Sequence, residues 1–207
     1  MALKASKSKT TLVVIAVAIG LIAGVKAYLY FQITNTKRSV STRSKGNESA
    51  PIKIVEFIDF QCPACAEGSK YLKKTMAERP DLIHLEMKYF PLAMHRHSEL
   101  SSQYAECASR QNKFWPMHDF LIERQAEWRN LEYVKDIFDL MANEIGVDKN
   151  IFAQCLDDAN VKEVIKSNKE EGAALGIKST PTYFINGEMV VGFKSLADKI
   201  QQLSPKP

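Results

Sequence analysis

Two patterns of apolar residues occur along this chain, one typical of strands and one typical of helices. From Ile52 to Phe90, strand-like segments come before the helical stretch. Ile52–Phe60 is a mostly apolar run, which is typical of a central strand covered on both faces. Leu82–Phe90 alternates between apolar and polar residues, which predicts a strand with one buried face. A helix is expected between them from Pro63, because proline is tolerated best in the first turn of a helix.

Helical spacing takes over from Leu100 to about Gly176. Apolar stripes in this stretch predict several helices, with glycines at the ends of two of them. The stripes are Leu100, Tyr104 and Cys107; Leu131, Val134, Phe138, Met141 and Ile145, ended by Gly146; Ile151, Cys155 and Leu156; and Val161, Val164 and Ile165. We therefore expect a helical block after the second strand.

The last part of the chain predicts a hairpin followed by a helix. Thr182–Ile185 and Met189–Val191 have the composition of strands, and the Asn186-Gly187 pair between them is a strong hairpin signal. Ser195 is expected to cap a final helix. The predicted order is strand, helix, strand, helical block, strand, strand and helix, which belongs to the α/β class. The apolar face of the final helix consists of Leu196, Ile200 and Leu203.

Residues 1–31 are predicted to be a signal-anchor. Leu12–Val25 is an uninterrupted run of apolar residues and glycine, and extended through Phe31 it spans about 20 residues, enough to cross a bilayer. Lysines precede the run, and two tyrosines follow it where an interfacial aromatic belt is expected. The alternative is a secretory signal peptide cleaved near Val25-Lys26-Ala27. The flanking residues are Lys4, Lys7, Lys9, Tyr28 and Tyr30.

Charge separates along the chain, although the net charge is only +4. Residues 1–45 contain eight Lys or Arg and no acidic residue, which leaves 20 basic and 24 acidic residues in the rest. The folded part is thus slightly acidic, which argues against a nucleic-acid partner. Residues 32–50 are polar and are predicted to be a linker, and residues 51–207 are long enough for one globular domain.

Two cysteines, Cys62 and Cys65, follow directly on the first predicted strand. Cys62 would lie at a helix N-terminus, where backbone N–H groups and the helix dipole favour a thiolate. Cys65, one turn further, could then attack a mixed disulfide at Cys62, so thiol–disulfide exchange is the working hypothesis. The alternative is half of a zinc site, which requires two more ligands. No second CxxC is present, and His95 and His97 are the nearest histidine pair.

Two further positions bear on the same chemistry. Pro181 directly precedes the predicted hairpin, where proline fits a strand start or edge, and an ordinary turn proline is the alternative interpretation. Glu56 lies six residues before Cys62 in the apolar strand, where burial would raise its pKa. A solvated glutamate at the edge of the sheet is the alternative, because one short strand does not establish which way Glu56 faces.

With Glu56, Cys62-Pro63-Ala64-Cys65 and Thr180-Pro181, the chain resembles the DsbA-like thiol oxidoreductases of the thioredoxin superfamily, in particular the membrane-anchored DsbA/BdbD type. The segments 105–108 and 113–119 also look like the inserted helices of that family. The resemblance implies a thioredoxin fold with a helical insertion at about 92–178. It implies that Pro181 is a cis-proline facing Cys62, that Thr180 offers backbone groups to a substrate strand, and that Glu56 moves protons to and from Cys65.

Cys107 and Cys155 each lie on the apolar face of a predicted helix. The resemblance implies that they form a second, structural disulfide, which an oxidising compartment would preserve. Two separate buried thiols and a second redox-active pair are the other interpretations.

The resemblance further implies an extracytoplasmic enzyme that introduces disulfides into exported proteins, without a cofactor or metal. The domain would be tethered to the outer face of a bacterial cytoplasmic membrane, or secreted after cleavage. Its partners would be reduced or unfolded exported proteins and a membrane re-oxidant of the DsbB or vitamin-K-epoxide-reductase type. The strongest oxidants of the family carry a histidine between the cysteines, whereas this chain has Pro63-Ala64. Milder oxidising power is therefore expected, and a reductase or isomerase, or a non-catalytic module that holds a metal or a client, remains an alternative.

Overall fold

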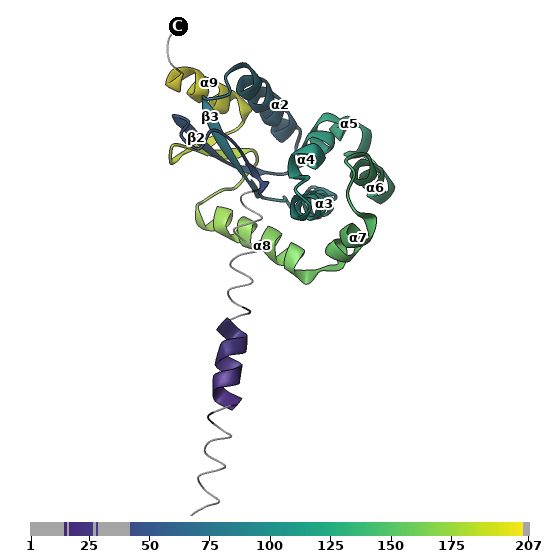
Figure 1. The fold of residues 1–207 in the computed structure, drawn as a ribbon. Helices are drawn as coiled ribbons and strands as arrows, with labels where there is room; N and C mark the ends of the chain where they lie inside the picture. The colour runs from purple at the N-terminus through teal and green to yellow at the C-terminus, as the bar shows by residue number, and fades with distance from the viewer. Residues whose placement is uncertain (1–14, 16, 27, 29–41, 205–207) are drawn as a thin grey trace, which may run out of the picture. The chain divides into compact units, whose positions relative to one another are not determined.

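The computed structural model describes residues 15, 17–26, 28 and 42–204 (Figure 1). The chain divides into two units, Met1–Arg38 and Ser39–Pro207. The second unit contains a five-stranded sheet in the order β1-β3-β2-β4-β5. Its central strands, β2 (Ile52–Ile58) and β3 (Ile83–Tyr89), are parallel, and the pairings with β1 (Ser44–Gly46), β4 (Thr182–Ile185) and β5 (Glu188–Val191) are antiparallel.

Helices cover both faces of this sheet, and Figure 1 shows α8 on the face opposite α2 and α9. Because neighbouring residues of a strand point to opposite faces, Glu56 and Phe57 face different helices. Phe57 lies against Gly172 of α8 (Ala159–Ala174). Glu56 pairs in register with Tyr183, which lies against Gly68 of α2 (Pro63–Glu78). Glu56 therefore points to the face that α2 and α9 (Phe193–Leu203) cover.

Six helices lie between β3 and β4 along the described chain. They are α3 (Ser98–Arg110), α4 (Phe114–Glu123), α5 (Gln125–Trp128), α6 (Lys135–Glu144), α7 (Lys149–Asp157) and α8. Aromatic side chains join them: the Tyr104 ring packs against Phe138 and Phe152, with ring centroids 5.3 and 5.4 Å apart, and Trp128 packs against Phe138 at 5.0 Å. Cys107 of α3 and Cys155 of α7 form a disulfide with their Cα atoms 5.7 Å apart.

Part of the predicted linker is a strand, so the linker prediction is wrong for Ser44–Gly46, which forms β1 against β3. The preceding Arg43 is 1% exposed and makes a 3.3 Å ion pair with Glu106 of α3. Lys45 lies 3.9 Å from the centroid of the Trp115 ring. The polar composition of this stretch suggested a linker because the partners that bury its two cations are distant in the sequence.

Two helix boundaries also differ from the predictions. Ser195 does not cap α9, because the helix begins at Phe193 after Gly192, whose φ of 85° turns the chain out of β5. Leu131 does not belong to the stripe of α6; it lies before the helix and is 42% exposed. The hairpin loop does have the expected conformation, with φ of 49° at Asn186 and 87° at Gly187.

Only part of the predicted signal-anchor falls within the described residues. Residues 17–26 are helical, and the large apolar side chains there are 57–66% exposed. Among the described residues, no helix combines the length and the hydropathy that crossing a membrane requires. Residues 1–14, 16, 27 and 29–31 of the predicted signal-anchor, and residues 32–41 of the predicted linker, lie outside the described residues.

Candidate active site

Cys62 and Cys65 lie at the start of α2, and both are free thiols. Cys62 is the N-cap residue, with Pro63 in the first turn, and its carbonyl accepts hydrogen bonds from the N–H groups of Cys65 and Ala66 at 3.1 and 3.2 Å. Cys62 is 7% exposed, whereas Cys65 is completely buried. Only Cys62 can therefore be reached by a thiol from outside.

The pKa values of the two thiols are shifted in opposite directions. Hydrogen bonding from the Cys65 thiol, together with backbone N–H groups at the helix start and the side chain of Thr180, lowers the pKa of Cys62 to about 5 despite its burial. Burial raises the pKa of Cys65 well above its usual value, and the hydrogen bond and charge of Cys62 raise it further. At neutral pH the reduced pair holds one thiolate, on Cys62, and one proton, on Cys65.

The loop before β4 lies against Cys62. The Thr180–Pro181 bond is cis, and the Cys62 thiol donates a hydrogen bond to the Thr180 carbonyl at 3.4 Å. Among the described residues, the buried Thr180 hydroxyl has no partner at hydrogen-bond geometry. It is thus available to donate to the sulfur once Cys62 has lost its proton. The structure brings Cys62 together with Thr180 and Pro181, although Cys62 lies 118 positions before Thr180.

Glu56 is completely buried on the face of the sheet that α2 covers. Burial raises the pKa of its carboxyl to about 8, an effect that Lys45 and the Tyr183 hydroxyl partly offset. Within the described part of the chain, neither carboxyl oxygen of Glu56, nor the Tyr183 hydroxyl, meets full hydrogen-bond geometry with a partner. The charge of the Glu56 carboxylate also raises the pKa of Cys65, so the protonation of each of these two groups affects the other. A carboxyl with this pKa can both donate and accept a proton near neutral pH.

Two glutamines that the sequence analysis did not single out hold the loop that carries Cys62. Gln125, at the start of α5, donates hydrogen bonds from Nε2 to the carbonyls of Phe60 and Cys62 at 2.7 and 3.0 Å. Gln61 donates from Nε2 to the Arg129 carbonyl at 2.7 Å, and its Oε1 accepts from the His97 N–H at 2.6 Å. No sequence signal marks these residues, because their partners lie up to 68 positions away.

His95 and His97, the pair weighed as metal ligands, bind protein groups. Nδ1 of His95 lies 2.7 Å from the Asp59 carboxylate, and Nε2 of His97 lies 2.7 Å from the Leu131 carbonyl. Asp59 also accepts the N–H groups of Gln61 and Leu92, at 2.8 and 2.9 Å. Within residues 42–204 and the described N-terminal residues, no group of three or more His, Cys, Asp or Glu side chains is arranged to hold a metal.

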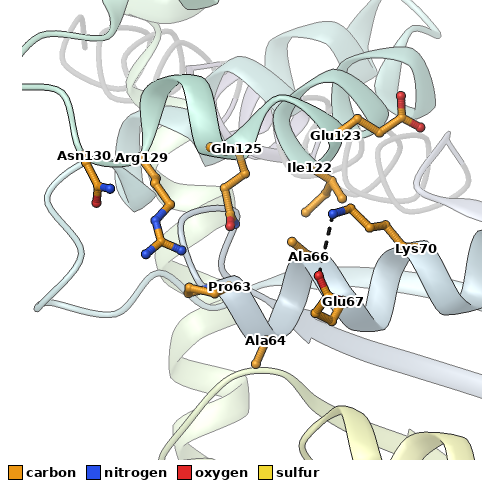
Figure 2. Close-up of a pocket in the computed structure, with 11 residues that line it drawn as sticks. Pro63, Ala64, Ala66, Glu67, Lys70, Ile122, Glu123, Gln125, Arg129 and Asn130 are labelled. Carbon is orange, nitrogen blue, oxygen red and sulfur yellow. Dashed lines mark ion pairs between the residues drawn. The ribbon is translucent and has the colours of Figure 1, made fainter.

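A cavity of about 490 Å³ lies beside Cys62, between the first half of α2 and the segment that runs from the end of α4 through α5 (Figure 2). Pro63 and Ala66 line it from α2, and Ile122, Gln125 and Arg129 line it from the other side. It therefore borders the turn that holds the reactive cysteine.

Comparison with known proteins places the chain in a family. The thioredoxin family matches residues 38–203. A probable disulfide bond formation protein D of Bacillus cereus is 25% identical over 204 residues, covering 90% of this chain and 92% of the relative. The solved structure of oxidised BdbD from Bacillus subtilis has a TM-score of 0.65 at 20% identity, covering 78% of this chain and 91% of that chain.

Other relatives are much longer proteins. The Na(+)/H(+) antiporter NhaA 3 of Salinispora tropica is 26% identical over 144 residues, which is 69% of this chain. The chain spans only 21% of the length of that relative.

Proposed function

Because the chain belongs to the thioredoxin family, we propose that it is an extracytoplasmic enzyme that introduces disulfides into exported proteins by exchange through Cys62 and Cys65. The observation that carries the proposal is the difference in acidity between the two thiols, with the pKa of Cys62 at about 5 and that of buried Cys65 far above the usual value. The name of the Bacillus cereus relative, a probable disulfide bond formation protein, supports the same reaction class. No transport activity is proposed, since this chain matches only 21% of the length of the antiporter relative.

The first step of the proposed reaction is attack on the oxidised pair. A client thiolate attacks the sulfur of Cys62, the Cys62–Cys65 bond breaks, and the electron pair of that bond leaves on the sulfur of Cys65. Cys65 is completely buried, so a thiolate there is unfavourable and takes up a proton. Glu56, whose pKa is raised to about 8 by burial, is mostly protonated at pH 7 and is the group that supplies it.

The second step releases the oxidised client. A second client thiolate attacks the client sulfur of the mixed disulfide, and Cys62 leaves as a thiolate. A low pKa makes Cys62 a good leaving group, so this step is favoured. Two electrons have then passed from two client thiols to the Cys62–Cys65 pair, which must be re-oxidised before the next turnover.

The pKa of Cys62 also predicts the strength of the oxidant. At pH 7 a thiol with a pKa of about 5 is present mainly as a thiolate, which stabilises the reduced pair relative to that of thioredoxin, whose thiol has a pKa of about 7. The potential of the Cys62–Cys65 pair is therefore expected to lie above the thioredoxin value of about −270 mV. The Pro63-Ala64 dipeptide adds no charge, so the potential is expected to stay below the DsbA value of about −120 mV.

The location and the re-oxidant belong to the same proposal. The basic N-terminus, the apolar run Leu12–Val25 and the exposed apolar side chains of residues 17–26 support a signal-anchor that tethers the domain to the membrane. A membrane partner of the DsbB or vitamin-K-epoxide-reductase type would then take the electrons. The tether would favour this exchange by raising the effective concentration of the two proteins.

The test is the reduction potential of the Cys62–Cys65 pair, measured on the full chain by equilibration with glutathione. We expect a potential well above −270 mV and toward the DsbA value of about −120 mV, and the same value in a Cys107→Ala/Cys155→Ala variant, because that pair lies outside the exchange. A potential near −270 mV, with rapid reduction of insulin, would overturn the oxidase in favour of a reductase. Tight binding of zinc without any thiol exchange would favour a metal-holding module instead.

A further inference from the structure

The cavity beside Cys62 has the size of a site for a small group rather than of a packing defect. Its volume of about 490 Å³ lies within the usual range of ligand pockets, roughly 300–1,000 Å³. Figure 2 shows Arg129 at one end, with its guanidinium turned toward Pro63, the residue that follows Cys62. Apolar Ala66 and Ile122 line the middle of the cavity.

The walls of the cavity are held by the same bonds that hold the reactive cysteine. Gln125 lines the cavity and donates to the carbonyl of Cys62 at 3.0 Å. The backbone carbonyl of Arg129 accepts a 2.7 Å hydrogen bond from Gln61, the residue before Cys62. The base of the Arg129 side chain therefore has a defined position relative to the turn that carries Cys62, and a group bound by Arg129 in the cavity would lie beside that turn.

The charges of the described residues that line the cavity are paired, except at the end where Arg129 lies. Lys70 lies 3.6 Å from Glu67, and Glu123 lies 2.6 Å from Lys73, so these lining charges are paired. Among the cavity-lining cations in the described part of the chain, Arg129 is the one without a carboxylate within ion-pair distance. A guanidinium presents several N–H donors in a plane that matches a carboxylate, so a carboxylate is the group it recognises best.

We propose that this cavity is a subsite for an acidic side chain of the client polypeptide, close in sequence to the cysteine that attacks Cys62, and that Arg129 binds its carboxylate. This inference rests on the proposed function, since it specifies which clients react fastest at the same site. It assigns to the α4–α5 side of the active site a role in client selection that is separate from the Thr180–Pro181 loop.

The test compares short peptides that contain one cysteine and carry Asp, Asn or Lys at each nearby position in turn. Both peptide termini are blocked, so the side chain is the only source of a carboxylate. The rate of mixed-disulfide formation with the oxidised full chain is measured for the wild type and for Arg129→Gln. At the position with the largest effect, we expect the ratio of the Asp-peptide rate to the Asn-peptide rate to fall about three- to fivefold in the variant, which is the contribution of a partly exposed ion pair. In the wild type, the same ratio should fall when salt is added.

The ratio between peptides is the deciding quantity because loss of Arg129 could change the acidity of Cys62 and thereby shift all the rates together. Arg129→Glu should reverse the preference, so that the Lys peptide reacts faster than the Asp peptide. The matched control is Arg79→Gln, which removes an exposed cation after the other end of α2, roughly 24 Å of helix away, and should leave the ratio unchanged.

The outcomes separate this inference from the proposed function. If all peptides react but the ratio is the same in the wild type and in Arg129→Gln, the subsite is overturned and the exchange activity stands. If no peptide reacts, binding of the Asp peptide with serine in place of cysteine is followed by NMR. Loss of that binding in Arg129→Gln would support the subsite while the proposed exchange fails, and equal or absent binding in both proteins would overturn the subsite as well.

Discussion

Gly68 of α2 lies directly against the hydroxyl of Tyr183, so closely that a Cβ built on Gly68 would overlap the hydroxyl oxygen. Tyr183 is the cross-strand neighbour of Glu56, the buried acid of the site. The missing side chain of Gly68 thus gives the tyrosine room to stay beside that carboxyl, under the helix that starts at Cys62.

Gly68→Ala should destabilise the protein by about 1–3 kcal/mol, because the tyrosine ring or the helix has to move to relieve the overlap. Urea denaturation measures the loss. Tyr183→Phe removes the hydroxyl that a Cβ would meet, so Gly68→Ala should cost clearly less in the Tyr183→Phe background. Equal costs in both backgrounds would show that the contact is unimportant.

Glu56→Gln should change how stability depends on pH. Because burial raises the folded-state pKa of Glu56 to about 8 from a usual value near 4.5, the folded state binds this proton more tightly than the unfolded state. The contribution of Glu56 to stability is thus fully present below about pH 4.5 and is lost as pH rises through 8. The variant should be close to the wild type at pH 4 and more stable than it at pH 8, by up to a few kcal/mol.

Urea denaturation at the two pH values provides the measurement for Glu56. Glu67→Gln is the matched control, because Glu67 is 61% exposed and makes a 3.6 Å pair with Lys70, so its removal should change stability by no more than about 0.5 kcal/mol at either pH. A stability difference for Glu56→Gln that does not vary with pH would contradict the raised pKa.

Gln125→Leu should loosen the turn that holds Cys62. The carbonyls of Phe60 and Cys62 lose a buried donor, which costs about 1–3 kcal/mol. The turn also orients the backbone N–H groups that favour the thiolate, so the pKa of Cys62 should rise from about 5 toward its usual value. Thiolate absorbance as a function of pH measures this rise.

The control is Gln201→Leu, at an exposed position of α9, which should change neither the stability nor the pKa of Cys62. An unchanged Cys62 pKa in Gln125→Leu would restrict Gln125 to a structural role.

The Cys107→Ala/Cys155→Ala variant should lose stability without losing exchange chemistry. The disulfide joins residues 48 positions apart, and closing a loop of that length contributes about 4 kcal/mol in the chain-entropy model. Denaturant unfolding of the oxidised proteins tests this loss, and glutathione equilibration should give the same potential for Cys62–Cys65. A large shift of that potential would mean that the second pair takes part in the redox reaction.

The sequence by itself determined the features that depend on a few neighbouring residues. The two strand patterns, the helix start at Pro63 and the Asn186-Gly187 turn follow from local periodicity and backbone preferences, and they place Cys62 at a helix N-terminus. Together with the resemblance, they were enough to predict the thioredoxin fold, which the family match confirms.

Tertiary structure alone decided which way Glu56 faces, since one short strand is compatible with either face and only the packing of α2 over Tyr183 buries the carboxyl. It also decided that Arg43 and Lys45 pack against the domain rather than lying in a linker. The hydrogen bond from Gln125 to the Cys62 carbonyl likewise depends on the tertiary structure. Each of these depends on a partner more than 60 positions away, such as Glu106 for Arg43 and Gln125 for Cys62. Local periodicity carries no information about such partners, because they come together only when the strands pair and the helices pack against the sheet and against one another.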